Sequence, residues 1–190
     1  MQLRTGRKQL LTWIKEDSLR GEGLRFVLFL CIYSLVRYLE LLFYSAPFGQ
    51  ALLNPLHEDL SYFISHICCF LLKGLYPDIH TSVNHIIFLA DKATIQLLPG
   101  CTGLGHMIRV GFALLLYPMS WVKKCYLFFP SLLIILFAAT IHFLLLIPIA
   151  FYYPNSFALA HDYFAKLLFF GFIFLCWMIW ERCRSDEVIK

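Results

Sequence analysis

The sequence predicts an all-α integral membrane protein with about four transmembrane helices, an outer amphipathic helix and a short β-hairpin. Hydrophobic residues fill 60% of the 190 positions and charged residues only 15%, whereas a soluble domain is usually near half apolar and a quarter charged. Apolar runs long enough to cross a bilayer recur along the chain. The net charge of +4 is small and lies mostly near the ends of these runs, which argues against nucleic-acid binding.

The first spanning segment is predicted at Phe26–Tyr44, a stretch close to the ~20 residues that a bilayer needs. It follows a basic segment, residues 1–25, and lacks a clear small-residue cleavage site, so we expect a retained span and not a cleaved signal peptide. Arg37 and Glu40 share one helical face, three residues apart. Arg37 is expected either to pair with Glu40 or to face protein or water, since charged side chains in spans avoid lipid.

An amphipathic helix is predicted at Pro55–Leu75, lying on the outer membrane surface. Asn54 is a good N-cap and Pro55 suits the first helical position, so the helix is expected to start there. Apolar residues follow one face at helical spacing, with polar residues opposite. These apolar residues are Leu60, Phe63, Ile64, Ile67, Leu71 and Leu75.

A short β-hairpin is predicted within Asn84–Leu97. Its two arms, residues 86–89 and 94–97, flank Asp91-Lys92, which supplies a small turn. The hairpin leads into Pro99-Gly100-Cys101, where a polar segment meets the next apolar run. A thiol at this junction can meet both water and a membrane-tethered substrate.

Three further spans are predicted at Leu104–Trp121, Cys125–Tyr153 and Tyr163–Trp180, from the length of their apolar runs. Together with the first span and the outer segment they form one membrane domain, residues 26–184. The last residues, 185–190, form a short polar tail that we expect in the cytoplasm.

Charge placement predicts the orientation of the spans, since Lys and Arg favour the cytoplasmic side. With four spans, three basic regions fall on one side: residues 1–25, Lys123-Lys124 and Arg182–Lys190. They hold six, two and three basic residues, which is 11 of the 16 in the chain. A fifth span at residues 58–75 would split these regions between the two faces, so four spans are favoured.

The four-span arrangement brings Cys101, His161 and the end of the third span beyond His142 to the outer face. Cys101 is expected to open a helix, and a helix N-terminus and a nearby cation both lower the pKa of a thiol. His161, at the same depth, can hold the thiolate and then protonate the leaving amine. The alternative is an inert structural thiol with an interfacial histidine.

The segment Cys101-Thr102-Gly103-Leu104 resembles the Cys-Ser-Gly-Ile/Leu signature of the exosortase/archaeosortase family, and His161-Asp162-Tyr163-Phe164 resembles its histidine segment. The resemblance covers roughly residues 24–184, including the spacing of the two segments and the hairpin before them. It implies a membrane transpeptidase with Cys101 as nucleophile and His161 as proton-transfer residue. Family members are thought to cut C-terminal sorting tails from exported proteins through a thioester and to transfer the protein to an acceptor.

One position departs from the family pattern. The family's third span carries an arginine in an Asn-x-x-Arg pattern, and the matching residues here are Ala139 and His142. His142 can donate a hydrogen bond but lacks the guanidinium fork. Arg109 lies eight residues after Cys101, about two helical turns deeper on nearly the same face. We expect Arg109, alone or with His142, to replace the missing arginine; the alternative is a member with lost or altered activity.

The sequence thus predicts a cysteine peptidase or transpeptidase of the cytoplasmic (inner) membrane that acts at its outer face through Cys101, His161, His142 and Arg109. The expected partners are exported proteins with a sorting tail, the lipid bilayer and an acceptor, with no nucleic acid, metal or organic cofactor. Two other hypotheses stay open. One is a non-enzymatic membrane subunit for assembly or export, with a structural Cys101. The other is metal or haem binding by His106, His142 and His161, for which no paired-ligand spacing exists.

Overall fold

The described part of the chain is mostly helical. The computed structural model describes residues 19–81, 86–89, 93–96 and 101–188. Several predicted features lie outside these ranges: most of the basic segment 1–25, the turn Asp91-Lys92, the pair Pro99-Gly100 and the end of the tail.

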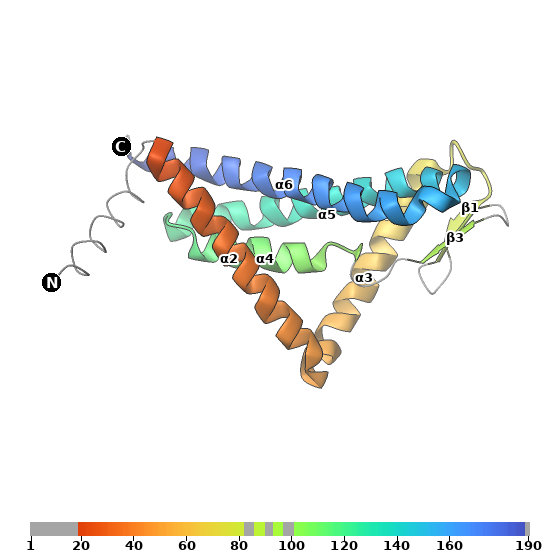
Figure 1. Ribbon diagram of the computed structural model, residues 1–190, viewed down its shortest axis with the longest axis horizontal. Helices are drawn as coiled ribbons and strands as arrows, with labels where there is room; N and C mark the ends of the chain where they lie inside the picture. The colour runs from red at the N-terminus through yellow and green to blue at the C-terminus, as the bar shows by residue number, and fades with distance from the viewer. Residues whose placement is uncertain (1–18, 82–85, 90–92, 97–100, 189–190) are drawn as a thin grey trace.

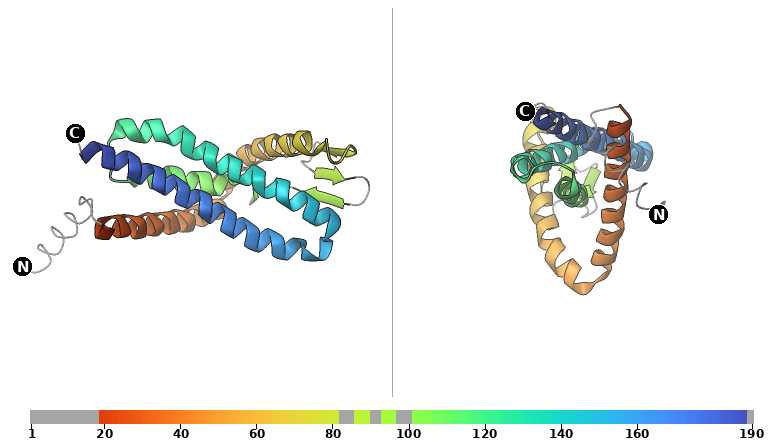
Figure 2. Two further views of the ribbon diagram at one scale, coloured as in Figure 1. Left: turned by 90° about the horizontal axis from the view of Figure 1, so that it is seen from above. Right: turned by 90° about the vertical axis from the view of Figure 1, so that its left-hand side faces the viewer.

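The elements follow in the order α2 (Leu19–Ser45), α3 (Pro47–Leu72), β1 (Ile79–Thr81), β2 (Ile86–Leu89), β3 (Ala93–Gln96), α4 (Leu104–Leu116), α5 (Trp121–Tyr152), η2 (Pro154–Ser156) and α6 (Phe157–Val188). Helices α5 and α6 form a long antiparallel hairpin joined by η2, and the shorter α4 lies beside α5 (Figure 1). Helices α2 and α3 form a V, and the end-on view shows α4 between its two arms (Figure 2).

Within the described residues, three helices are long and apolar enough to cross a membrane: Gly21–Ser45, Trp121–Tyr152 and Pro154–Arg184. The predicted span Leu104–Trp121 is a shorter helix, because α4 ends at Leu116. Tyr117 has an extended backbone, with φ −65° and ψ 139°, which is the conformation that the following Pro118 favours. The 13 residues of α4 rise about 20 Å, less than the ~30 Å hydrocarbon core.

The start of α3 differs from the prediction. The helix begins at Pro47 and contains Pro55, so the predicted start at Asn54-Pro55 is wrong. Pro47 occupies a first-turn position that proline favours, whereas Pro55 leaves the carbonyl of Ala51 without its helical partner. Ala51 is exposed, so this carbonyl is not sealed inside the protein. The helix continues because it buries one face: Gly49, Leu53, His57, Ser61, Ile64, Ser65, Cys68 and Leu72.

A three-stranded antiparallel sheet in the order β1-β2-β3 follows α3. Strands β2 and β3 pair with Ile87 opposite Ile95, within the segment predicted as a hairpin. Strand β1, in which Ile79 pairs with Leu89, was not predicted, because three residues are too few to show a period. Ile79, Ile87 and Ile95 are buried, so one face of the sheet packs against the helices.

A buried charged cluster ties three helices together at one end of the molecule. Glu181 on α6 binds Arg25 of α2, with Nη2–Oε1 at 2.5 Å, and Arg184, at 2.8 Å. Tyr117, just after α4, donates a hydrogen bond to the same carboxylate. The start of α2, the end of α4 and the end of α6 therefore meet at one end of the molecule (Figure 1). We call these four residues the Glu181 cluster.

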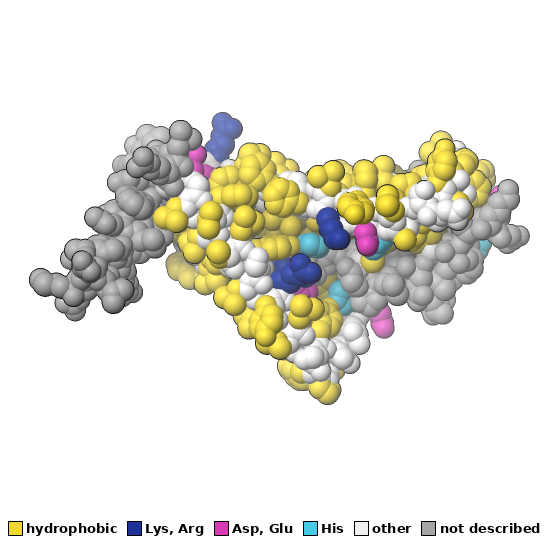
Figure 3. All heavy atoms as spheres, in the orientation of Figure 1, with side chains coloured by type: hydrophobic (Ala, Val, Ile, Leu, Met, Phe, Trp, Pro, Cys, Tyr) yellow, Lys and Arg dark blue, Asp and Glu magenta, His cyan; other side chains and the backbone are white. Residues whose placement is uncertain are grey.

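Large apolar side chains cover the outside of the helices (Figure 3). Val122 and Tyr126 on α5 are 81% and 78% exposed, and Phe70 on α3 is 80% exposed. A soluble monomer rarely exposes apolar patches of this extent. The surface is that of a membrane protein, in which lipid covers these side chains.

Candidate active site

The turn Cys101–Gly103 is held by its own backbone and by α5. Gly103 has a φ of +77°, in the left-handed region that favours glycine. A Cβ at this position would lie 3.2 Å from Cβ of Ala139 on α5, so the turn packs closely on that helix. Helix α4 begins at Leu104. Cys101 therefore stands three residues before the helix and does not open it, contrary to the expectation from sequence.

The thiol of Cys101 faces the imidazole of His161 on α6. Their Sγ and Nε2 atoms lie 3.2 Å apart, although the residues are 60 positions apart in the chain. The other ring nitrogen of His161, Nδ1, lies 3.5 Å from Oδ1 of Asp162. An acid beside Nδ1 favours the tautomer that leaves Nε2 free to accept a proton from the thiol.

His142 on α5 lies beside His161 and forms a group of three side chains with it and Cys101. Its ring centroid lies 5.3 Å from that of His161, and the residue is only 1% exposed. Within the described residues, neither ring nitrogen of His142 makes a hydrogen bond of good geometry, although the backbone of His161 lies close to the ring. Buried polar groups in proteins are nearly always hydrogen-bonded, so these nitrogens are available to a ligand.

Arg109 on α4 lies in a polar network with α2. Its Nε atom lies 2.6 Å from Oε2 of Glu40, and its Nη1 atom lies 3.5 Å from the hydroxyl of Tyr33. That hydroxyl is also hydrogen-bonded to Nδ1 of His106. Arg109 thus has protein partners for part of its guanidinium, and Glu40 pairs with Arg109 across 69 positions instead of with Arg37.

A cavity of about 370 Å³ gathers these side chains. The four residues predicted as catalytic all line it, together with residues of α2 and α6. The lining is Tyr33, Arg37, Cys101, His106, Arg109, His142, His161, Ala165, Lys166, Phe169, Phe170 and Ile173. Figure 3 shows charged and histidine side chains gathered on this face, between α2 and α6, within an otherwise hydrophobic surface.

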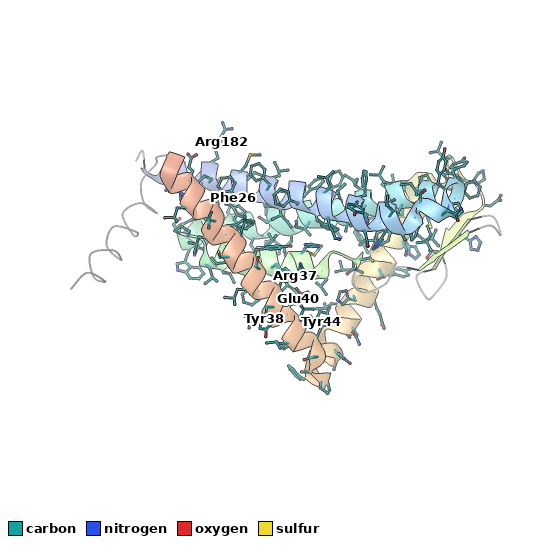
Figure 4. All side chains as sticks on the ribbon, viewed as in Figure 1. Phe26, Arg37, Tyr38, Glu40, Tyr44 and Arg182 are labelled. Atoms are coloured by element: carbon teal, nitrogen blue, oxygen red, sulfur yellow. The ribbon has the colours of Figure 1, made fainter. Side chains whose placement is uncertain are left out.

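Two further cations line the cavity. Arg37 projects from α2 beside Glu40 (Figure 4), and the structure gives it no hydrogen bond or ion pair among the residues it describes. Lys166 on α6 lies over the ring of Tyr163, with 5.9 Å from Nζ to the ring centroid. No aspartate or glutamate is among the cavity-lining residues; the nearest carboxylates, those of Glu40 and Asp162, bind Arg109 and lie beside His161, respectively.

Burial controls the resting state of the thiol. Cys101 is partly buried, and this burial raises the pKa of its thiol above the ordinary value of 9.0. This direction is opposite to the lowering of the pKa expected from a helix N-terminus and a nearby cation, because burial disfavours the charged thiolate. Burial therefore favours the neutral thiol, which needs a base to become a nucleophile.

The three histidines considered as metal ligands line the same cavity but make different contacts. His106 stacks on Phe169, with ring centroids 4.2 Å apart, and bonds Tyr33, while His142 faces His161. The residues that the structure describes contain no group of three His, Cys, Asp or Glu side chains placed to hold a metal ion.

Sequence reasoning singled out Arg37 and Glu40 as a pair within α2 but missed the role of their neighbours Tyr33 and Tyr44. The four residues recur at helical spacing along one face of an apolar helix, and this polar stripe could have predicted a polar partner for α2. His57 on α3 had no such signal. Its buried contact with Thr102 joins residues 45 positions apart and is visible only in the fold.

A family model described as transmembrane exosortase matches residues 26–179 of the chain. A search of curated proteins gave no match, and neither did a search of solved structures.

Proposed function

The chain belongs to the transmembrane exosortase family, and from that membership and the 3.2 Å contact between Cys101 and His161 we propose a cysteine transpeptidase. Its substrates are exported proteins with a C-terminal sorting tail, which it cuts through a thioester. The cut protein then passes to an acceptor. This contact carries the proposal, because nucleophilic acyl transfer requires a thiol with a base within hydrogen-bonding distance.

The first half-reaction forms the thioester. Sγ of Cys101 attacks the carbonyl carbon of the scissile peptide bond while its proton passes to Nε2 of His161. The C–N bond then breaks, and the same proton passes from Nε2 to the leaving nitrogen of the tail. General-base assistance suits this site, because burial raises the pKa of the thiol and a neutral thiol attacks poorly.

The second half-reaction releases the protein. An acceptor amine, or water in the case of hydrolysis, attacks the thioester carbonyl and gives its proton to Nε2 of His161. The C–S bond breaks, and the thiolate of Cys101 regains a proton from the imidazolium. The enzyme returns to its starting state, with one amide or carboxyl group formed.

Charge develops on the carbonyl oxygen in both half-reactions and needs a donor. His142 is suited to this role because its ring nitrogens are buried and make no hydrogen bond of good geometry within the described residues and its ring lies beside that of His161. Arg109 lines the same cavity, but its Nε atom already binds Glu40. We assign the direct hydrogen bond to His142 and charge stabilisation to Arg109.

The proposed place of the reaction is the outer boundary of the cytoplasmic membrane. His161 precedes Glu181 by 20 residues in one continuous helix, which is about 30 Å and matches the hydrocarbon thickness. The Glu181 cluster lies at the end that carries the basic residues expected in the cytoplasm. His161 and its partners then lie near the opposite interface, where water is available.

Replacement of the nucleophile tests this function. Cys101→Ala should abolish removal of the sorting tail from a co-expressed candidate substrate, read as a shift on a gel. Cys125→Ala is the matched control, because Cys125 is exposed on α5 and should leave processing unchanged. Full processing by Cys101→Ala would exclude the enzyme and favour a non-enzymatic membrane subunit.

A further inference from the structure

A second histidine reaches the turn Cys101–Gly103 from α3. Nδ1 of His57 lies 2.7 Å from Oγ1 of Thr102, and the two residues are 3% and 0% exposed. The other ring nitrogen of His57, Nε2, is hydrogen-bonded to the hydroxyl of Tyr44 at the end of α2. A continuous polar chain therefore joins both arms of the V to the residue next to the nucleophile.

The hydroxyl of Thr102 is the central atom of this chain. Besides His57, it contacts the backbone N–H of Leu104, the first residue of α4, at 3.4 Å. The Thr102 side chain is thus fixed between α3 and α4, while Gly103 is pressed against α5. With the two residues that follow it fixed, Cys101 is held from its C-terminal side, which restricts where Sγ can lie relative to His161.

His57 contacts the turn without facing the reaction. It is absent from the lining of the catalytic cavity. It lines a neighbouring cavity of about 330 Å³ with Tyr44 and Glu40, and this cavity shares Arg109 and His106 with the catalytic one. Elsewhere the buried face of α3 consists of apolar residues such as Leu53 and Ile64 and of two small serines, Ser61 and Ser65. Packing alone would be served by another apolar side chain, since a buried imidazole costs free energy unless both nitrogens are bonded.

We propose that His57 is a positioning residue for the nucleophile, and that through Thr102 it holds Cys101 within hydrogen-bonding distance of His161. The inference rests on the proposed function in taking Cys101 and His161 as the reacting pair. Acyl transfer requires atoms placed to within a fraction of an ångström. Loss of the His57–Thr102 bond should therefore uncouple the thiol from its base even where the fold survives.

Coupling between His57 and His161 tests this role without any substrate. The rate of Cys101 alkylation by iodoacetamide is measured near neutral pH on the purified full chain, with each cysteine quantified separately by mass spectrometry. The variants are His57→Leu, His57→Asn, Thr102→Val and Thr102→Ser, each with and without His161→Ala. The exposed Cys125 reports the general reactivity of each sample.

His161→Ala should slow Cys101 alkylation about tenfold in the wild-type, His57→Asn and Thr102→Ser backgrounds, the size of one lost hydrogen bond to a charged group. In the His57→Leu and Thr102→Val backgrounds, which cannot make the bond, the effect should fall below about twofold. An equal effect of His161→Ala in all backgrounds would overturn the positioning role. If His57→Leu does not fold, Thr102→Val against Thr102→Ser decides the question.

The outcome is independent of the proposed function. Unchanged tail removal by Cys101→Ala defeats the enzyme, whereas alkylation rates depend only on the position and ionisation of the thiol. Melting temperatures of the same variants show whether a substitution lowers the stability of the whole fold. If His57 had only a structural role, His57→Asn would not restore the dependence of the alkylation rate on His161.

Discussion

The two ends of helix α6 carry two polar clusters with opposite properties. At the C-terminal end, Glu181 is buried and bonded to Arg25, Arg184 and Tyr117. Near the N-terminal end, the cavity around His161 holds His142, whose ring nitrogens make no hydrogen bond of good geometry among the described residues. The polar groups of the first cluster bind one another, whereas the second contains ring nitrogens and cationic side chains that face a cavity.

This difference separates a structural role from a functional one. Polar side chains within a membrane protein are costly unless they are paired, and a fully paired network rigidifies the fold. A polar network with unpaired groups is expected where a ligand binds those groups. The Glu181 cluster therefore fixes the ends of three helices, while the cavity around His161 is the site that we propose for the substrate.

The largest expected effect is the loss of the base. His161→Ala should reduce tail removal by about 10²–10⁴-fold, the usual contribution of general acid–base catalysis, with no change in the amount of folded protein. The rate is followed by the disappearance of the full-length substrate. His66→Ala is the control, because His66 is an exposed histidine on α3. Equal rates for the two variants would remove the distinction between the two ends of α6.

The next effect belongs to the Glu181 cluster and should appear in stability. Glu181→Ala leaves Arg25 and Arg184 buried without their carboxylate, which should cost about 3–5 kcal/mol of unfolding free energy. Denaturation of the detergent-solubilised protein measures the loss, with the exposed Glu58→Ala as control. If Glu181→Ala instead lowers Cys101 reactivity at unchanged stability, the two clusters do not have separate roles.

Removal of the proposed oxyanion donor should have a smaller effect. His142→Phe keeps the volume of the buried ring but not its nitrogens, and it should slow tail removal about 10²-fold, as expected for one lost donor. The KM for the substrate should change little, because the donor acts mainly in the transition state. Arg109→Ala should slow the reaction too. Full processing by both variants would show that neither replaces the family arginine.

The proximity of Cys101 and His161 could be predicted from sequence, because both stand at the ends of apolar runs that charge placement was expected to orient alike. The sequence could not predict which side chain each polar residue would bind. Glu40 has Arg37 three residues away on its own helix, yet it binds Arg109, which α4 brings into the V. His57 contacts Thr102 only because α3 crosses the bundle at that point. Such contacts depend on helix crossing, which no local pattern contains.

Helix limits show the same division between local and tertiary causes. Pro118 ends α4 as a local rule requires, and a prediction that counted it would have stopped there. Pro55 sits inside α3 against the local rule, because burial of one helical face outweighs a single missing hydrogen bond. The neighbouring Asn54 has the residue type of an N-cap and therefore predicted a helix start, although it lies in the interior of α3.

The smallest effect is a pH dependence. Because burial raises the pKa of the Cys101 thiol above 9.0, the thiolate fraction at neutral pH is small. Alkylation of Cys101 should therefore rise about tenfold per pH unit as the pH approaches that pKa. Iodoacetamide labelling at a series of pH values measures the profile. A rate that is already at its plateau near pH 7 would indicate a preformed thiolate and contradict general-base assistance.

The acyl-enzyme tests the central claim most directly. A substrate protein mixed with the purified chain should become covalently linked to Cys101, and intact mass spectrometry should find an adduct of the protein without its tail. Neutral hydroxylamine should release it as a hydroxamate, since thioesters react with this nucleophile. Tail removal without an adduct at Cys101, and with the same rate in Cys101→Ala, would contradict acyl transfer through this thiol.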